Sequence, residues 1–177
     1  MDNEQERSLS WLAGILDGEG SITFQTTFRS DGKLSVSPFV CVSNSDEGII
    51  EEVKALFGAL IANRKTGTVH CFAAKPYNRP SSFASDKTCY TIRVNGTATK
   101  PILEAVLPYL KSVKRKHAQT LLTYLESRAN GLLLRGQRGR VVRTGYTNAE
   151  IDLVVSTRTH KLAKSSETLR SALNIVG

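Results

Sequence analysis

The chain has 177 residues, of which 40% are apolar and 23% are charged, a balance typical of a folded globular protein. This length favours a single domain, 1–177, with a core of ordinary size. No apolar run approaches the roughly 18 residues that cross a membrane. The polar, acidic start MDNEQERS does not resemble a signal or transit peptide. We therefore expect an intracellular protein with no membrane partner; prokaryotic cytoplasm and organelle both stay open.

The net charge of +8 is unevenly distributed along the chain. Residues 1–60 contain ten acids and four basic residues, whereas residues 111–143 contain nine basic residues and one acid, Glu126. A basic half beside an acidic half favours a polyanionic partner, with nucleic acid as the leading candidate. The alternative, a basic face kept for solubility, is only slightly less favoured by charge alone.

Hydrophobic periodicity and turn signals predict an α+β chain with antiparallel strands. The expected order is a helix at 8–18, strands at 21–29 and 33–43 joined at Asp31-Gly32, and a helix from a Ser45 or Asp46 cap to about Phe57, closed by Gly58. Strands follow at about 60–65, 68–74 and 87–94, then a helix capped by Thr97 or Thr99 and a helix at 111–128. Residues 131–177 are expected to form a basic, Gly/Arg-rich connection (131–145) and two C-terminal helices.

The stretch LAGILDGEGSI (12–22) lies at the end of the first expected helix. One apolar stripe at helical spacing precedes and enters it, and a second contains Trp11, Gly14, Ile15 and Gly18. A helix with two such stripes is buried on two sides, and small residues let another backbone approach closely. Burial of both sides inside one domain is the alternative, and from spacing alone it is the better one.

Two acids, Asp17 and Glu19, end this helix, which we expect to close with a left-handed turn at Gly18. The C-terminal end of a helix carries the negative pole of its macrodipole, where acids cost some tenths of a kcal/mol and cations are favoured. Acids at this place therefore indicate a bound cation. Mg²⁺, which prefers oxygen ligands, is the natural candidate.

The residues WLAGILDGEGSI resemble the signature of the LAGLIDADG homing endonucleases, and nine consecutive motif positions fit. The segment LPYLKSVKRKHAQ (107–119) resembles a later family segment of the form PxLxxKxxQA, while the last fifty or so residues match only loosely. The resemblance implies the family's α+β fold, an antiparallel curved β-sheet that forms a DNA-binding saddle with helices on its other face. One departure is Glu19, where most members have Asp; the longer side chain keeps an oxygen ligand but moves it.

The resemblance implies a site-specific double-strand DNA endonuclease of intron homing, which hydrolyses phosphodiesters with Mg²⁺ and leaves short 3′ overhangs. Mn²⁺ or Ca²⁺ would substitute in binding. In the family two motif helices pack side by side, and their final acids meet at the foot of the pair. No second such motif follows in residues 60–177. A homodimer is therefore expected, with metal ligands at Glu19 and Gly18 and an interface of Trp11, Gly14, Ile15 and Gly18.

Three residues match catalytic positions of the family. Glu19 is the motif's final acid. Asn44 aligns with a polar residue that holds active-site water, although a role as a helix N-cap is equally expected. Lys114 aligns with a basic residue near the scissile phosphate; otherwise it is one more solvated lysine beside Lys111, Arg115 and Lys116.

The polar face of the expected sheet is the candidate DNA surface. Side chains of the strand at 21–29 alternate between an apolar set and an entirely polar set, and β-ribbons read base edges with such sets. A solvated sheet face is the alternative for each residue. Strand length and a two-fold axis indicate a pseudo-palindrome on the order of 20 base pairs. The connection at 131–145 is expected to hold phosphates rather than read bases. The DNA-binding candidates are Thr23, Gln25, Thr27, Arg29, Ser35, Ser37, Asn63, Arg64, Lys65, His70, Lys87, Arg93, Arg138 and Arg140.

Two other functions stay open for a chain of this pattern. One is an RNA-binding splicing maturase, and the other is a transcription regulator that binds DNA without cutting it. The acid at position 19 favours the nuclease, because a protein that only binds has no use for it.

Overall fold

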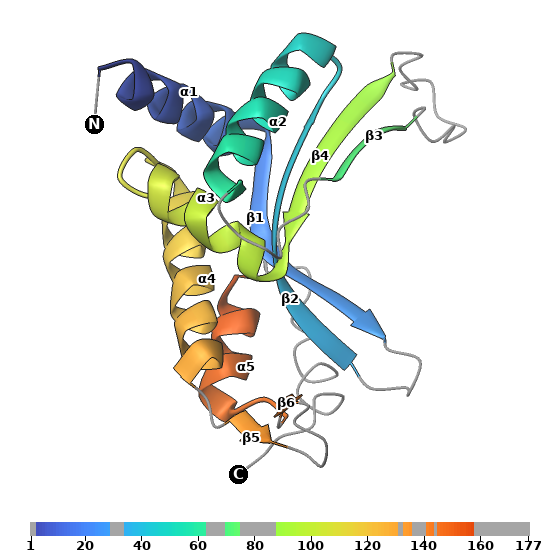
Figure 1. The fold of residues 1–177 in the computed structure, drawn as a ribbon, viewed down its shortest axis with the longest axis vertical. Helices are drawn as coiled ribbons and strands as arrows, with labels where there is room; N and C mark the ends of the chain where they lie inside the picture. Colours follow the sequence, from blue (N-terminus) through green and yellow to red (C-terminus); the bar gives the residue numbers. More distant parts are fainter. Residues whose placement is uncertain are drawn as a thin grey trace.

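Helices lie on one face of an antiparallel sheet in this computed structural model, which describes residues 3–28, 34–62, 70–74, 88–130, 133–135, 141–143 and 145–157 (Figure 1). The elements are α1 (Asn3–Glu19), β1 (Gly20–Phe28), β2 (Leu34–Asn44), α2 (Glu47–Ile61), β3 (His70–Ala74), β4 (Cys89–Asn95), a 3₁₀ turn η1 (Gly96–Ala98), α3 (Thr99–Val106), α4 (Val113–Asn130), β5 (Leu133–Arg135), β6 (Val141–Arg143) and α5 (Asn148–Ser156). The expected α+β class and its antiparallel sheet are confirmed.

The main sheet has the strand order β1-β2-β4-β3, and every neighbouring pair is antiparallel. The β1–β2 hairpin pairs from Gly20↔Val42 to Phe28↔Leu34. Strand β4 pairs with β2 only along Phe39–Asn44. The far half of the hairpin therefore continues as a two-stranded ribbon, and Figure 1 shows it curving away past the end of β4. Strands β5 and β6 form a separate two-stranded sheet.

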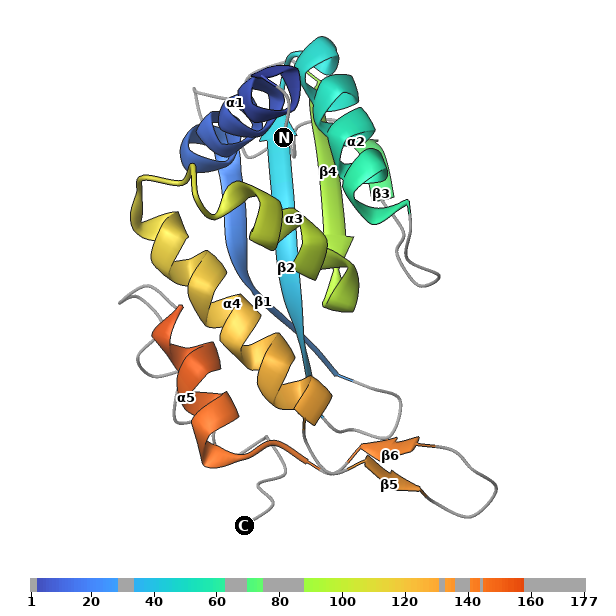
Figure 2. The same ribbon diagram turned by 60° about the vertical axis from the view of Figure 1, so that its left-hand side comes forward.

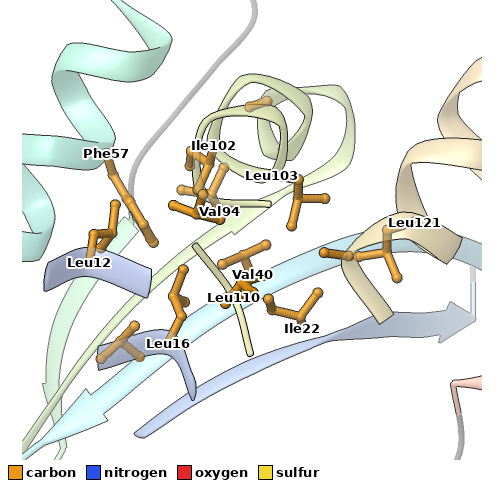
Figure 3. Close-up of a cluster of buried hydrophobic side chains, with 14 of the residues drawn as sticks. Leu12, Leu16, Ile22, Val40, Phe57, Val94, Ile102, Leu103, Leu110 and Leu121 are labelled. Carbon is orange, nitrogen blue, oxygen red and sulfur yellow. The ribbon is translucent and has the colours of Figure 1, made fainter. Parts of the chain in front are cut away.

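The hydrophobic core lies between the main sheet and the helices α1 to α4 (Figure 2). Alternate residues of β1, β2 and β4 point toward the helices and are buried, as period-two alternation predicts. Burial of each large aliphatic side chain contributes about 1.5–3 kcal/mol. Figure 3 shows the centre of this cluster: Leu12, Leu16, Ile22, Val40, Phe57, Val94, Ile102, Leu103, Leu110 and Leu121.

The first helix differs from its expected form at both ends. It begins at Asn3 rather than residue 8, and it continues through Gly18 to Glu19. The expected left-handed turn at Gly18 is wrong, because Gly96 is the one glycine of the described residues with a positive φ, 67°. The position that requires glycine is instead Gly20. A Cβ there would lie 2.7 Å from the Leu16 carbonyl oxygen, so only glycine lets β1 start directly where α1 ends.

The second helix is longer than expected and removes a strand. Asp46, one of the two expected caps, is the N-cap and accepts hydrogen bonds from the N–H groups of Gly48 and Ile49. The helix does not close at Gly58 but runs to Ile61, because Phe57 and Ile61, four residues apart, are both buried in the core. The expected strand at 60–65 is therefore wrong at residues 60 and 61, and residues 63–65 lie outside the described part.

The remaining elements follow the expected order with two local corrections. Strands β5 and β6 form within 131–145, where only a Gly/Arg-rich connection was expected. Neither Thr97 nor Thr99 caps α3. The turn η1 leads into the helix, and the Thr99 hydroxyl donates back to the Gly96 carbonyl (2.7 Å). Helix α5 is the first of the two expected C-terminal helices, and the second falls outside the described residues. None of the described helices has the length and apolar character needed to span a membrane.

Candidate functional site

The C-terminal end of α1 is bonded reciprocally to the N-terminal end of α4. From α1, the Asp17 carboxylate accepts the Lys111 N–H at Oδ2 (2.8 Å) and the Ser112 hydroxyl at Oδ1 (2.5 Å). Ser112 in turn accepts the N–H of Lys114 (3.1 Å), as residues before a helix start do. The acid of one helix therefore fixes the first turn of the other.

Lys114 completes this contact from the α4 side. Its ammonium donates to the carbonyl oxygens of Leu16 (2.7 Å) and Asp17 (2.8 Å). The last four carbonyls of a helix lack partners within it, and a cation is favoured there. A cation was expected at this end of α1 from the two acids, and a lysine of the chain itself supplies one. Lys114 is half-buried, whereas Lys111, Arg115 and Lys116 around it are exposed.

The charge state of Asp17 follows from these contacts. Burial raises the pKa of its carboxyl, but the hydrogen bonds from Ser112 and Lys111 and the positive charge of Lys114 outweigh burial. The pKa of Asp17 is therefore held below its ordinary value. This carboxylate is ionised at neutral pH and already committed to protein donors.

Glu19 is available for a ligand. It is exposed at the last position of α1 and makes no hydrogen bond or ion pair with the described residues. Lys114 takes the carbonyls of Leu16 and Asp17, which leaves those of Gly18 and Glu19 at the helix end. One carboxylate and neighbouring carbonyl oxygens suit a hard divalent cation that keeps water and binds phosphate. In the described residues no three His, Cys, Asp or Glu gather as a complete metal cage.

Asn44 lies at the same end of the sheet, because Gly20 pairs with Val42 and β2 ends at Asn44, two residues further on. Its side-chain oxygen accepts the Asp46 N–H (2.8 Å) and so shapes the turn that leads into α2. The N-cap itself is Asp46. A role for Asn44 in holding water stays a prediction.

His117, one turn after Lys114, also faces this region. Burial lowers the pKa of its imidazole, as do the charges of Lys116 and Lys114, against a hydrogen bond with the Ile22 backbone that raises it. The net lowering keeps His117 neutral at neutral pH. Sequence reasoning missed both His117 and the role of Asp17, because neither contact is local in the chain.

The outward face of α1 carries the four residues expected at a dimer interface. Gly14 and Gly18 are exposed, and a Cβ added to either would meet nothing within 4 Å. Trp11 and Ile15 are half-buried and pack against the edge of the core. Each glycine costs a helix about 1 kcal/mol relative to alanine. Packing and backbone geometry within the described part of the chain give no reason for this cost.

The face of the sheet away from the helices carries the polar set of strand residues, since the alternate residues are buried toward the helices. The register joins Thr27 to Ser35 and Gln25 to Ser37 across the hairpin, and Arg93 to Cys41 between β4 and β2. Thr23 lies on the same face, in register with Phe39. His70 is the register partner of Arg93, which extends that row to β3.

A hydroxyl pair on this face was missed in the sequence. Ser43 and Thr91 are register partners, and their hydroxyls lie 2.9 Å apart. Alternation along β2 places Ser43 on the same face as Cys41. That Thr91 is its partner becomes clear only once the β2–β4 register is known. Seven of the sequence-predicted DNA contacts lie outside the described residues: Arg29, Asn63, Arg64, Lys65, Lys87, Arg138 and Arg140.

No protein-family model matches this chain, and no curated protein does. Solved structures of homing endonucleases are similar to it. I-CvuI, in complex with its target in the presence of calcium, aligns with a TM-score of 0.63 at 20% identity, over 97% of this chain and 95% of that one. The group I intron-encoded I-CeuI, complexed with DNA, gives 0.58 at 18%, over 94% and 75%. I-TnaI gives 0.54 at 18%, over 97% and 99%. These alignments establish a shared fold along nearly the whole chain.

The contact between α1 and α4 predicts a pH-dependent contribution to stability. Asp17→Asn removes the charge, and we expect it to lower the free energy of unfolding by about 1 kcal/mol at pH 7. Because the folded pKa of Asp17 is lowered, this contribution is present above the ordinary carboxyl pKa of about 4 and disappears as the pH falls through the lower folded value. Urea unfolding at fixed protein concentration, with chelator, measures it at pH 7 and near pH 3. Glu52→Gln, at an exposed acid of α2, is the control, and an Asp17→Asn loss that is equal at both pH values would contradict the prediction.

Proposed function

We propose that this chain, which has the fold of the LAGLIDADG homing endonucleases, is a site-specific double-strand DNA endonuclease that acts as a homodimer. The observation that carries the proposal is the end of α1. There the exposed carboxylate of Glu19 follows by two residues the Asp17 carbonyl that the Lys114 ammonium binds. The outward face of the same helix holds two glycines, Gly14 and Gly18, that no packing contact among the described residues requires.

The dimer would bring two such helix ends together. Packing of α1 against α1 of a second copy through Gly14 and Gly18 allows a close approach of the two backbones. Each copy then contributes one Glu19 at the two-fold axis, so that each of the two DNA strands meets one cutting site. Symmetry requires a pseudo-palindromic target. Cuts placed across the minor groove leave short 3′ overhangs.

Glu19 and the Gly18 carbonyl are the groups that would hold a divalent cation, Mg²⁺ in the cell, with Mn²⁺ or Ca²⁺ as substitutes in binding. Such an ion, when bound by oxygen ligands and phosphate, supplies a Lewis acid and a water of lowered pKa. Asp17 already accepts hydrogen bonds from Lys111 and Ser112. We therefore assign it to orienting the start of α4 and not to holding the ion. Asn44 orients water from the adjacent end of β2.

Lys114 would stabilise the transition state. Phosphodiester hydrolysis places additional negative charge on the phosphate oxygens, and a fixed ammonium nearby lowers the energy of that state. The two carbonyl contacts hold this ammonium in place before DNA arrives, so little reorganisation is needed. The exposed Lys111, Arg115 and Lys116 suit ground-state contact with phosphates.

The polar face of the main sheet would lie in the major groove and read bases, with Thr23, Gln25, Thr27, Ser35, Ser37 and Arg93 among the contacts.

A splicing maturase and a regulator that does not cut are the competing functions. Both would use the basic and polar surfaces, but neither explains the exposed acid at the end of α1. Selection of cleaved duplexes from a random library with Mg²⁺ tests the proposal: recovery of one pseudo-palindromic site supports it, and recovery of none overturns it.

Glu19→Gln should abolish cleavage, by at least about 10³-fold in single-turnover rate, because it removes a metal ligand. Binding of the selected site should stay nearly unchanged, since Glu19 makes no base contact. Gel-shift titration and single-turnover cleavage of the selected duplex measure the two effects. Glu52→Gln is the matched control. Residual cleavage of the Glu19 variant within tenfold of wild type would show that another acid does the chemistry.

Lys114→Met keeps most of the side-chain stem and removes the charge. We expect cleavage by pre-bound enzyme to fall by roughly 10²-fold, in the range seen when one oxyanion donor is lost. Affinity for the site should change little. Lys111→Met and Lys116→Met, at exposed lysines of the same segment, should cleave almost normally. Equal behaviour of all three variants would mean that Lys114 is an ordinary phosphate contact.

Gly14→Leu should abolish the dimer without harming the folded chain. A Cβ at this position meets nothing within 4 Å, and leucine favours a helix more than glycine does by about 1 kcal/mol. Sedimentation and thermal unfolding separate association from folding. Ala55→Leu, which places the same side chain at an exposed position of α2, should leave the dimer intact. A wild-type chain that is monomeric at micromolar concentration would contradict the shared active site.

A further inference from the structure

The two-stranded part of the β1–β2 hairpin has an edge with no neighbouring strand. Side chains from elsewhere in the chain bond the backbone groups at this edge. In an antiparallel ladder, alternate residues direct their N–H and C=O groups away from the paired strand. Val36 of β2 is such a residue on the side where β4 would continue, and β4 pairs with β2 only from Phe39 onward. The Val36 N–H donates to the Tyr146 hydroxyl (2.8 Å), and the Tyr124 hydroxyl donates to the Val36 carbonyl (3.4 Å). Two tyrosine hydroxyls therefore stand where the next strand is missing.

Tyr146 is itself held by a part-buried ion pair. The Arg128 guanidinium lies 4.9 Å from the centre of its ring and donates to the Gly145 carbonyl (3.0 Å). Arg128 also bonds Glu150 (3.4 Å), a buried residue whose carboxylate accepts the Thr147 N–H (2.9 Å) at the start of α5. We name Tyr146, Arg128 and Glu150 the Tyr146 brace. It connects α4 and α5 to a single peptide unit of β2.

Tyr124, which bonds the same residue of β2 as the brace does, packs on the face opposite the expected base contacts. On the helix side of the ribbon, the ring of Tyr124 packs edge-on against Phe24 of β1, with centroids 4.9 Å apart. On the other side lie the register pairs Gln25↔Ser37 and Thr27↔Ser35. A two-stranded ribbon alone is only marginally stable in water. Its position and twist therefore depend on Tyr124 and the brace.

We propose that the Tyr146 brace is a positioning device that sets sequence specificity at the outer base pairs of the target. The proposal rests on the proposed DNA-cleaving function. Base readout needs hydrogen-bond donors and acceptors held in narrow geometry, and the outer pairs of polar residues sit on the part of the hairpin that has no third strand. The inner row, with Arg93 and Cys41, belongs to the region where β4 is paired and does not depend on the brace.

Hydrogen exchange of the free protein tests the mechanical part. Tyr146→Phe removes the hydroxyl and keeps the ring. The Val36 amide should exchange about fivefold faster, the effect of losing one hydrogen bond of ordinary net strength, while amides of β4 stay unchanged. Thr157→Val is the matched control, because it removes a buried hydroxyl whose hydrogen bond, to the Val154 carbonyl, stays at the end of α5. Unchanged exchange at Val36 in Tyr146→Phe overturns the proposal.

Cleavage of a duplex library tests the specificity part. With Tyr146→Phe, discrimination at the outermost base pairs of each half-site should relax by roughly tenfold, while inner discrimination and the rate at the best site stay near wild type. Thr157→Val should give the wild-type profile. Should Tyr146→Phe not fold, Tyr124→Phe carries the same comparison at the other hydroxyl. A wild type that cuts no duplex refutes the proposed function, whereas a wild type that cuts and a variant with an unchanged profile overturn this inference alone.

Discussion

The end of α1 and the segment that leads into α4 meet at the site, and each binds a side chain from the other. The last turn of α1 presents carbonyls and receives the Lys114 ammonium; directly before α4, the Lys111 N–H and the Ser112 hydroxyl donate to Asp17. Both favourable contacts are lost if the helices move apart. Because Glu19 follows Asp17 by two residues, the same contact fixes where an exposed carboxylate emerges from the fold. The chemistry proposed for this chain depends on that arrangement.

The same constraint explains why α1 has such an unusual composition. One side of the helix must enter the core with Leu12 and Leu16, which are fully buried. The end must carry acids, and the outward side holds glycines that weaken the helix. A helix of this composition is a poor helix by propensity alone, and packing against the sheet and the bond to Lys114 hold it in place. The low helix propensity of α1 is therefore compensated by its tertiary contacts.

The sequence predicted what is local and periodic. Alternation assigned the faces of β1 and β2, and the hairpin formed where its turn signal lay. Errors came where tertiary packing overrode a local preference: Gly58 does not end α2, because Ile61 one turn on is drawn into the core, and Gly18 stays helical, because the tight turn falls at Gly20. Contacts across long separations left no local signal. Lys111 and Asp17 are 94 residues apart, and Val36 and Tyr146 are 110 apart. The resemblance to a family position suggested a role for Lys114, but it did not reveal the groups that Lys114 binds.

The direct passage from α1 into β1 at Gly20 has a consequence for the length of DNA that a pair of chains can span. No loop residues separate α1 from β1, and buried residues of both elements pack in the core. In a pair of chains joined through α1, the distance and rotation between the two sheets are therefore inherited from the crossing angle of the two helices. Proteins whose DNA-binding domains are joined by flexible linkers tolerate half-sites at variable spacing. In such a pair, one inserted or deleted base pair at the centre would turn the duplex by roughly a tenth of a turn, and the direct junction of α1 and β1 could not absorb it.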